Sequence, residues 1–296
     1  MKTQVFSGTS NGAAEIIKSG GLVAVPTETV YGLAGSGLNE QAVGMIYEVK
    51  GRPAIKPLSL MIHGSEAMDA LCLDVPEQAR TLAARFWPGP LTIVLKAKPE
   101  IPSIVLAGGS TVGLRCPDHP LTLELLRDCG LPLAAPSANP SGEESPKDAG
   151  KVLEYFDGKI DAVIDGGRCG LGRESTIIDM SKTPYRILRQ GALPAEDIAD
   201  ALVGGMKIIG ITGGTGCGKT TALQELEAMD ALVLDCDAIY HELLESSTEL
   251  LGEIEKCFPN TVQDGKLDRK ALGAVVFADA AALSNLNAIT HKYVGM

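Results

Sequence analysis

Short apolar runs alternate with amphipathic stretches along most of the chain, and this alternation restricts the fold to the α/β class. Near the N-terminus, the pattern predicts a helix over residues 11–19 and a strand over 22–25, with two glycines between them. A second helix is expected over 40–50, and further strands are expected over 58–62, 91–95, 112–114, 162–164 and 176–178. The length of 296 residues is enough for about two domains.

The segment ALVGGMKIIGITGG contains the clearest domain boundary. A predicted helix ends near Val203, two glycines follow, and Met206 begins a new apolar run, as expected where two chains have been fused. We therefore expect one domain over residues 1–205 and a second over 206–296. The second domain should begin with a strand over 207–212.

Charge and composition exclude several classes of protein. The net charge is −11 and aromatic residues make up 4% of the chain, so strong direct binding to nucleic acid is not expected, although a local basic pocket is compatible with these values. The seven cysteines form no C-x-x-C pair and the four histidines lack metal-ligand spacing, which favours reduced thiols over a zinc site. Because no signal-peptide pattern and no apolar stretch of about 18 residues occurs, we expect a cytoplasmic protein that does not engage a membrane.

The segment GGTGCGKT, residues 213–220, matches the phosphate-binding pattern G-x-x-x-x-G-K-[ST]. A predicted strand precedes it and the helical pattern TALQELEAM follows it, which is the context this motif requires. Its glycines let backbone N–H groups approach phosphate oxygens at the positive end of the helix. Lys219 would then reach the β- and γ-phosphates, and Thr220 would hold Mg²⁺. The alternative is a glycine-rich turn with an exposed lysine.

Two acidic residues follow the loop. The segment ALVLDCD predicts a strand over 231–234 that ends at Asp235 and Asp237, beside the nucleotide site of a parallel sheet. Two carboxylates in that position are suited to act as a base and a metal ligand. A helix N-cap and a turn residue are the ordinary alternatives for a single D-x-D pattern.

Residues 207–291 resemble dephospho-coenzyme A kinase, through IGITGGTGCGKTTALQEL, LDCDAIYHELL, DGKLDRKALGAVVF and LNAITH. The resemblance implies Asp237 as the base that deprotonates a ribose hydroxyl. It implies ATP binding by Gly216, Cys217, Gly218, Lys219, Thr220 and Thr221. An arginine common in that family is His241 here, and the chain stops at HKYVGM, before that family's lid. We therefore expect a truncated P-loop α/β unit that binds nucleotide but is a weak or inactive kinase.

Five segments of the first domain carry more polar and charged side chains than a buried core needs. They are VAVPTETVYGL, EVKGRPAIKPL, STVGLRCPDHP, LAAPSANPSGEESP and RESTIIDMSKTPYRILRQ. The three cations of the second segment are suited to a triphosphate, and Arg115 of the third is suited to a carboxylate. Taken singly, each segment has an ordinary alternative: strand and turn propensity, a solvated basic loop, an ion pair of Arg115 with Asp118 or a neighbour, or N-cap chemistry.

Together and in this order, PTETVYGL, KGRPAIKPL, LRCP, APSANPSG and ESTIID resemble the YrdC-like family of threonylcarbamoyl-AMP synthases, over residues 10–195. The resemblance implies a mixed, twisted α/β sheet around a basic cavity. It implies conversion of L-threonine, bicarbonate and ATP to threonylcarbamoyl-AMP and pyrophosphate, with Mg²⁺ as cofactor. Other proteins then use the product to modify tRNA.

The resemblance also assigns residue roles. Lys50 and Arg52 are the expected catalytic cations, because fixed positive charge stabilises a departing pyrophosphate without a covalent nucleophile. The expected ATP-binding residues are Lys50, Arg52, Lys56, Thr111, Ser137, Asn139, Ser145 and Arg189. The expected threonine-binding residues are Thr29, Arg115, Ala135 and Ser175. Many relatives carry a histidine where this chain has Met61, with His63 two positions on, which leaves the threonine contact from that strand unassigned.

Three other functions remain open at this point. An RNA-binding or ribosome-assembly module is one, although the acidic charge favours a small-molecule pocket. Kinase activity of the second domain as the main function is another. A carbamoyl-transfer role in metalloenzyme maturation is the third, and relatives with that role usually carry additional domains.

Overall fold

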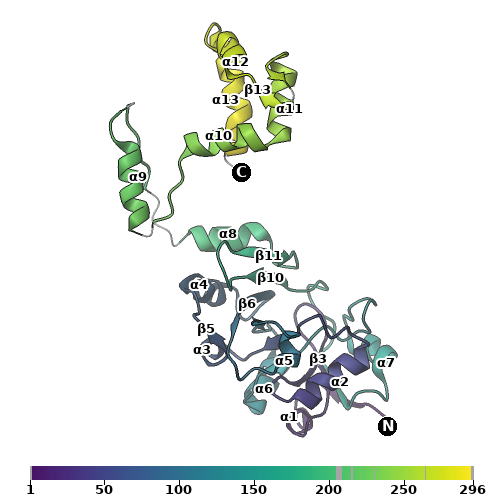
Figure 1. The fold of residues 1–296 in the computed structure, drawn as a ribbon. Helices are drawn as coiled ribbons and strands as arrows, with labels where there is room; N and C mark the ends of the chain where they lie inside the picture. Colours follow the sequence, from purple (N-terminus) through teal and green to yellow (C-terminus); the bar gives the residue numbers. More distant parts are fainter. Residues whose placement is uncertain (1, 205–208, 215, 230, 264, 295–296) are drawn as a thin grey trace. The chain divides into compact units, whose positions relative to one another are not determined.

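The structure is a computed structural model that describes residues 2–204, 209–214, 216–229, 231–263 and 265–294, without the side chains of residues 236, 237, 263 and 294. The chain divides into two compact units, Met1–Lys207 and Ile208–Met296 (Figure 1). The boundary expected between residues 205 and 206 falls on 205–208, outside the described residues.

The first unit is built on one mixed sheet. Its strands are β1 (Gln4–Ser7), β2 (Val23–Val25), β3 (Gly32–Ser36), β4 (Ser59–Met61), β5 (Cys72–Leu73), β6 (Leu91–Ala97), β7 (Thr111–Arg115), β8 (Leu133–Ala134), β9 (Ala162–Asp165), β10 (Thr176–Asp179) and β11 (Arg186–Arg189). They lie in the order β1-β9-β2-β3-β8-β4-β7-β6-β10-β11, and β5 pairs with β6. Pairing is parallel between β1 and β9, β2 and β9, β4 and β7, and β6 and β10, and the other pairs are antiparallel. This confirms the predicted mixed α/β class.

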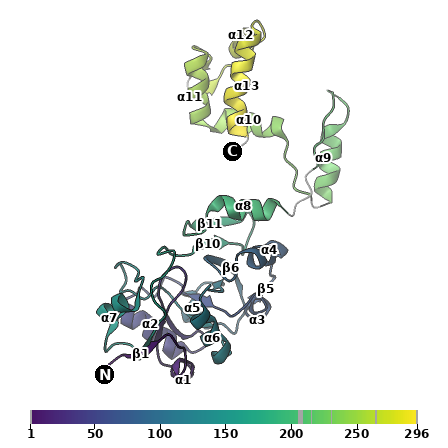
Figure 2. The same ribbon diagram turned by 180° about the vertical axis from the view of Figure 1, so that it is seen from behind.

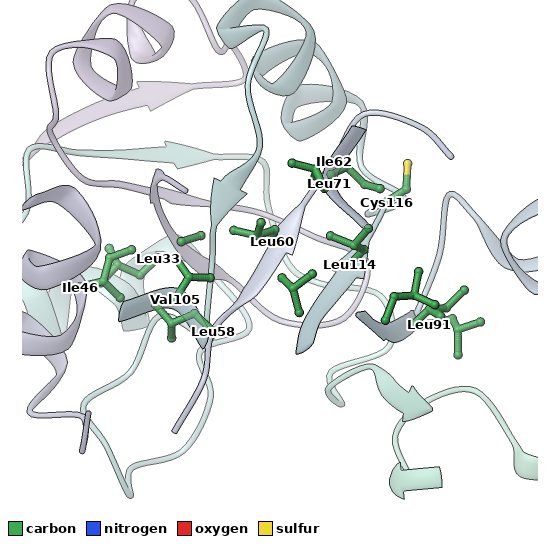
Figure 3. Close-up of a cluster of buried hydrophobic side chains, with 14 of the residues drawn as sticks. Leu33, Ile46, Leu58, Leu60, Ile62, Leu71, Leu91, Val105, Leu114 and Cys116 are labelled. Carbon is green, nitrogen blue, oxygen red and sulfur yellow. The ribbon is translucent and has the colours of Figure 1, made fainter. Parts of the chain in front are cut away.

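Both faces of the sheet are buried. Successive residues of a strand point to opposite sides of a sheet, and here they enter two different buried clusters. In β2, Val23 belongs to one buried cluster and Ala24 to the other. Leu60 and Met61 of β4 divide in the same way. Figure 3 shows part of the larger cluster, where Leu60 lies near Leu114, its register partner on β7. A sheet buried on both sides can hold polar side chains only where strands end, and this positions the site described below.

Helices cover both faces of this sheet, as Figures 1 and 2 show from opposite sides. Their bounds are α1 (Ala13–Lys18), α2 (Glu40–Lys50), α3 (Ala67–Leu71), α4 (Glu77–Phe86), α5 (Ser103–Leu106), α6 (Pro120–Cys129), α7 (Ala149–Phe156) and α8 (Ala195–Val203). α1 and α6 pack together and bury Ile17 and Leu125 in the smaller cluster. The larger cluster receives side chains from α2, α4, α7 and α8, among them Ile46, Leu82 and Phe156.

The helices and strands predicted for the first unit are confirmed. The predicted helices correspond to α1 and α2, and the predicted strands correspond to β2, β4, β6, β7, β9 and β10. No strand bounds were predicted for β1, β3, β5, β8 or β11. The sequence of β3 is GLAGS, which has little strand propensity, yet the whole strand is buried. Small residues are needed there, since a Cβ on Gly35 would lie 2.9 Å from Cδ2 of Leu22.

The second unit is helical. It contains α9 (Lys219–Ala228), α10 (Cys236–Ser246), α11 (Thr248–Cys257), α12 (Arg269–Val276) and α13 (Ala280–Val294), with a hairpin of β12 (Val262–Gln263) and β13 (Lys266–Leu267). α10, α11, α12 and α13 share a small core that includes Leu250, Ile254 and Leu286. The α9 helix contributes no buried residue.

Two strands predicted for this second unit do not appear in the described residues. The strands expected over 207–212 and 231–234 are not formed: residues 209–214 and 231–234 have no regular secondary structure, and 207–208 lie outside the described part. Ile209 is 62% exposed and Leu232 is 82% exposed. A parallel strand needs hydrogen-bonded neighbours and cover on both faces, and no described segment of this unit supplies them to these runs.

Across the described residues, no helix has the length and apolar character needed to cross a membrane. The described cysteines whose state is known, residues 72, 116, 129, 169, 217 and 257, are free thiols.

Candidate active site

One cleft in the first unit collects the polar segments identified in the sequence. Its volume is about 160 Å³, and it is partly open to solvent. Its walls come from the turn before β3, the loop after α2, the ends of β4, β7 and β11, the segment after β8, and the start of β10. The residues that line it are Val30, Tyr31, Gly32, Arg52, Pro57, Leu58, Ser59, Met61, Thr92, Arg115, Ala135, Pro136, Ser137, Glu174, Ser175, Ile177 and Arg189.

Three arginines from different parts of the chain line the cleft: Arg52, Arg115 and Arg189. Nε and Nη2 of Arg52 donate to the carbonyl oxygens of Lys56 and Pro57, at 3.2 and 2.9 Å. These bonds hold the loop after α2 around the guanidinium of Arg52. Burial lowers the pKa of Arg189, the nearby carboxylate of Glu174 opposes that shift, and the charges of Arg115 and Arg52 add to it. The cleft is therefore locally basic in an acidic chain.

Arg115, at the end of β7, is 7% exposed. Its Nη2 lies 2.8 Å from Oε1 of Glu28 and donates to Oγ1 of Thr29, also at 2.8 Å. Its Nε donates to the carbonyl oxygen of Gly89 at 3.3 Å. The expected ion pair with a neighbour is thus formed with Glu28, and it is buried. Thr29 is fully buried behind Arg115 and does not line the cleft.

The start of β10 brings Ser175 to the cleft. Oγ of Ser175 and Oγ1 of Thr92 are 2.8 Å apart. Nε and Nη2 of Arg189 both donate to the Ser175 carbonyl oxygen, at 3.1 and 2.9 Å, and Nη2 also donates to Oγ of Ser175 at 3.3 Å. Two hydroxyls and a guanidinium therefore face the same space, which is a suitable environment for a small polar molecule.

Lys50, the last residue of α2, is 3% exposed and does not line the cleft. Its Nζ donates to the carbonyl oxygens of Ser137 and Asn139. Burial, and then the charge of Arg52, lowers the pKa of Lys50 to about 7. The amide Nδ2 of Asn139 donates to the carbonyl oxygens of Pro140 and Glu143, at 2.9 and 2.7 Å. In this structure both side chains hold the loop after β8 in shape, while Ser137 itself lines the cleft.

Glu174 was missed by the sequence analysis, although it opens the ESTIID motif. Its carboxylate lines the cleft, and its Oε1 accepts a hydrogen bond from Oγ of Ser145 at 2.7 Å. The Ser145 hydroxyl thus acts on the cleft through Glu174. The available signal was position, because Glu174 directly precedes Ser175, a predicted ligand, at the start of β10.

Two further predicted ATP-binding residues, Lys56 and Thr111, also do not line the cleft. Lys56 is exposed at the tip of the loop after α2. Thr111 begins β7, whereas Arg115 ends it, so the two residues are at opposite ends of the strand.

Met61, where many relatives have a histidine, lines the cleft. His63 does not line it, and its Nε2 lies 3.3 Å from Nη2 of Arg127. Ala135 lines the cleft as expected.

The phosphate-binding motif of the second unit forms a loop at the N-terminus of α9. Gly216 and Gly218 adopt positive φ angles of 79° and 86°. Nζ of Lys219 donates to the carbonyl oxygens of Gly213 and Gly214, at 2.7 and 3.0 Å. Cys217, Thr220 and Thr221 are exposed.

The two acidic residues that follow belong to the start of α10. Oδ1 of Asp235 accepts a hydrogen bond from the backbone N–H of Ala238 at 3.2 Å, which is the N-cap arrangement. The side chain of Asp237 lies outside the described part of the chain. Among the described residues, no group of three or more His, Cys, Asp or Glu side chains is arranged to hold a metal ion.

Residues 15–191, more than half of the chain, match the family model Sua5_yciO_yrdC, whose description is "Telomere recombination". The chain belongs to the Sua5/YciO/YrdC family. A second family model, dephospho-CoA kinase, matches residues 207–296. That segment is therefore dephospho-CoA kinase-like.

Curated relatives resemble the first unit. The threonylcarbamoyl-AMP synthase of Pyrococcus abyssi is 47% identical over 196 residues, which are 66% of this chain and 57% of that protein. The threonylcarbamoyl-AMP synthase of Bacillus subtilis is 46% identical over 193 residues, which are 65% of this chain and 56% of that protein. The chain thus spans little more than half the length of these relatives.

Solved structures share the fold of the first unit. P. abyssi Sua5 complexed with L-threonine superposes with a TM-score of 0.66 at 43% identity, covering 71% of this chain and 63% of that one. E. coli YciO superposes with a TM-score of 0.59 at 26% identity, covering 64% of this chain and 96% of that one. The twisted mixed sheet is therefore a known architecture.

Proposed function

We propose that the first unit is a threonylcarbamoyl-AMP synthase, which converts L-threonine, bicarbonate and ATP to threonylcarbamoyl-AMP and pyrophosphate. The observation that carries this proposal is the meeting of Arg52, Arg115 and Arg189 in one cleft with the hydroxyls of Ser175 and Thr92. Anion-binding groups and hydroxyl groups are what a triphosphate and a small hydroxy amino acid require together. The names of the curated relatives and of the threonine complex support the same reaction.

Arg52 and Arg189 are the residues we assign to the phosphates. Both guanidiniums are held by backbone carbonyl oxygens, so their positions are fixed before the reaction begins. Negative charge grows on the departing pyrophosphate as threonine carbamate attacks the α-phosphorus, and preorganised cations stabilise that charge. Ser137 lines the same cleft, and we assign it to the nucleotide as well.

Arg115 is the residue we assign to the threonine carboxylate. Its described contacts use Nε and Nη2, so the face of the guanidinium that includes Nη1 is the part directed to a ligand. The Ser175 hydroxyl lies on the same cleft wall and is the second polar contact for threonine. Thr29 supports Arg115 through its hydroxyl and is a positioning residue in this scheme.

Mg²⁺ is the cofactor we propose for this site, bound together with ATP. Such an ion neutralises charge on the phosphate oxygens. Glu174 supplies a carboxylate, the kind of ligand that Mg²⁺ prefers.

We further propose that the protein is cytoplasmic and that its product passes to tRNA-modifying proteins. The acidic charge of the chain disfavours strong direct binding of tRNA.

The dephospho-CoA kinase-like segment is a second candidate for nucleotide binding. The match of residues 207–296 to that family and the positive φ angles of Gly216 and Gly218 support phosphate contact by its loop. Mg²⁺ held through Thr220 belongs to the same proposal. We propose that it binds nucleotide weakly and contributes little kinase activity.

The test is release of pyrophosphate from ATP and bicarbonate, with and without L-threonine, and with L-serine in its place. A kinase transfers the γ-phosphoryl group and releases no pyrophosphate, so this product reports the first unit alone. We expect release that depends on threonine and is weaker with serine. Release that ignores threonine, or no release by folded protein, would overturn the synthase proposal and leave coenzyme A synthesis or RNA binding to be tested.

A further inference from the structure

Glu174 is the one acidic side chain among the described residues that line the cleft. Three arginines share the cleft with it, yet no cation of the described chain lies within ion-pair distance of its carboxylate. Arg189 donates to Ser175 instead, and Nη2 of Arg173 donates to the carbonyl oxygen of Gln190. A carboxylate in an arginine-rich cleft therefore has no partner of opposite charge in direct contact.

The position of Glu174 is fixed by its backbone. Its carbonyl oxygen accepts a hydrogen bond from the N–H of Ala192 at 2.8 Å. The segments approach so closely that a Cβ on Gly191 would lie 2.4 Å from this oxygen, a distance that only glycine tolerates. Ser145 then orients the side chain through Oε1. Among the described residues, no side chain other than that of Ser145 donates a hydrogen bond to this carboxylate.

The carboxylate is ionised at neutral pH. The hydrogen bond from Ser145 lowers the pKa of Glu174, and its own backbone N–H and the charges of Arg189 and Arg173 lower it further, against the opposing effect of burial. A charged carboxylate next to a bound triphosphate repels it. A divalent cation between the two reverses the sign of that interaction.

Mg²⁺ in nucleotide sites is held by one or two carboxylates together with substrate phosphates, and it keeps several waters. One fixed carboxylate oxygen beside the phosphate-binding arginines meets that requirement. We propose that Glu174 is the protein ligand of the divalent cation that enters the cleft with ATP. This proposal rests on the proposed function of the first unit, and it is independent of Thr220 in the second.

The test measures ATP affinity by calorimetry, in Mg²⁺ and in EDTA, without threonine or bicarbonate. Every protein carries Lys219→Ala in the full chain, so that binding by the second unit is removed. The compared forms are the Lys219→Ala parent, Glu174→Gln and Glu174→Asp. Glu143→Gln is the matched control, because Glu143 is exposed and its side chain does not line the cleft.

We expect Mg²⁺ to tighten ATP binding in the parent and in the Glu143→Gln control. In Glu174→Gln that enhancement should fall by about tenfold or more, while the affinity in EDTA is unchanged or higher because a repelling charge is gone. Glu174→Asp should recover part of the enhancement, since it restores a carboxylate. The amide of Gln still accepts the Ser145 hydrogen bond, so the local fold is preserved.

Equal loss of ATP affinity in Mg²⁺ and in EDTA would show that Glu174 only supports the cleft, and would overturn the proposal. An enhancement that survives Glu174→Gln, or that falls as much in the control, would also overturn it. Failure of the Lys219→Ala parent to bind ATP under either condition would instead overturn the proposed function of the first unit.

Discussion

Nη2 of Arg115 lies 2.8 Å from Oε1 of Glu28, and the two side chains are only 8% and 14% exposed. Oε2 of Glu28 accepts a hydrogen bond from the backbone N–H of Asp118 at 3.0 Å. The pair therefore connects the turn before β3 to the segment that follows β7. Removing one member of a buried ion pair is costly, because the other charge is left without compensation in a poorly solvated site.

Glu28→Gln should destabilise the first unit by about 3–5 kcal/mol, since it leaves the charge of Arg115 buried and unpaired. The measurement is urea unfolding followed by the fluorescence of Trp87, the single tryptophan of the chain, which reports the first unit. Glu48→Gln removes an exposed carboxylate and should change the free energy of unfolding by about 0.5 kcal/mol or less. Equal effects of the two substitutions would contradict the importance of the pair.

Arg115→Lys should lower kcat/KM for L-threonine by about a hundredfold or more, because an ammonium cannot hold Glu28 and Thr29 on one nitrogen while another nitrogen binds a substrate carboxylate. The KM for ATP should change little. Steady-state pyrophosphate release at varied threonine measures the effect. The control is Arg127→Lys, an exposed arginine outside the cleft. A selective rise in the KM for ATP would instead place Arg115 at the nucleotide.

Arg52→Ala should lower the rate of pyrophosphate release by about 10²–10³-fold, because it removes about 3–4 kcal/mol of charge stabilisation at the phosphates. The fold should persist, since the bonds of Arg52 to the carbonyl oxygens of Lys56 and Pro57 lie within its own loop. Single-turnover release at saturating ATP measures the effect, with thermal unfolding as the check of folding. Arg168→Ala, an exposed arginine, is the control. An unchanged rate would remove Arg52 from the reaction.

Short apolar runs in the sequence predicted the strands that are rich in apolar side chains. The strand of Val23 was predicted because residues 22–25 form a continuous apolar run. The strand GLAGS was missed because its strand state depends on close packing of Gly35 against Leu22, which is a long-range contact. The run containing Ile209 was wrongly predicted as a strand for the converse reason: its apolar pattern is present, but no described neighbour pairs with it.

In the candidate site, too, residue types were predictable from the sequence, whereas long-range contacts were not. Cations and hydroxyls in short motifs were recognised from residue type, and Arg52, Arg115 and Arg189 do meet in one cleft. The partners of Lys50 were not predictable, because carbonyl oxygens from the loop after β8 carry no signal in residue type. Glu174 was missed for a related reason, since its bond to Ser145 joins two motifs 29 positions apart.

Lys50 should make the stability of the first unit depend on pH above neutrality. Its pKa in the folded protein is about 7, below its usual value, so the unfolded chain binds more protons between about pH 7 and 10.5. The buried charge is therefore most costly at pH 7 and below, and stability rises as the pH rises through this window, by at most about 1.4 kcal/mol per pH unit. The neutral amine retains two N–H donors for the two carbonyl oxygens.

The measurement compares the chain with Lys50→Met by urea unfolding at several pH values between 7 and 10. Met is pH-independent at this position, so the difference in unfolding free energy isolates Lys50 from thiols and tyrosines that titrate in the same range. The free energy of unfolding of the unsubstituted protein should rise relative to that of the variant as the pH rises. A difference that stays constant would mean that Lys50 keeps its proton, with its ammonium stabilised by the carbonyl oxygens of Ser137 and Asn139.

The glycine-rich loop of the second unit leads into α9, which has no buried side chain. In P-loop enzymes the lysine is directed at the phosphates, whereas Nζ of Lys219 here bonds to carbonyl oxygens of its own loop. The α9 helix buries no side chain, so nothing described fixes the direction of its N-terminus. Transfer of a phosphoryl group depends on positioning at the level of about an ångström.

We therefore expect the chain to form no coenzyme A from ATP and dephospho-coenzyme A at an ordinary kinase rate, as followed by chromatography of the product. Hydrogen exchange should show fast amide exchange in α9 and slower exchange in α11, where Leu250 and Ile254 are buried. Coenzyme A formation at an ordinary rate that Lys219→Ala abolishes and Arg52→Ala leaves intact would contradict this, because it would place an active kinase in the second unit. Protection of α9 equal to that of α11 would contradict the structural reason, since protection requires a packed face that α9 lacks.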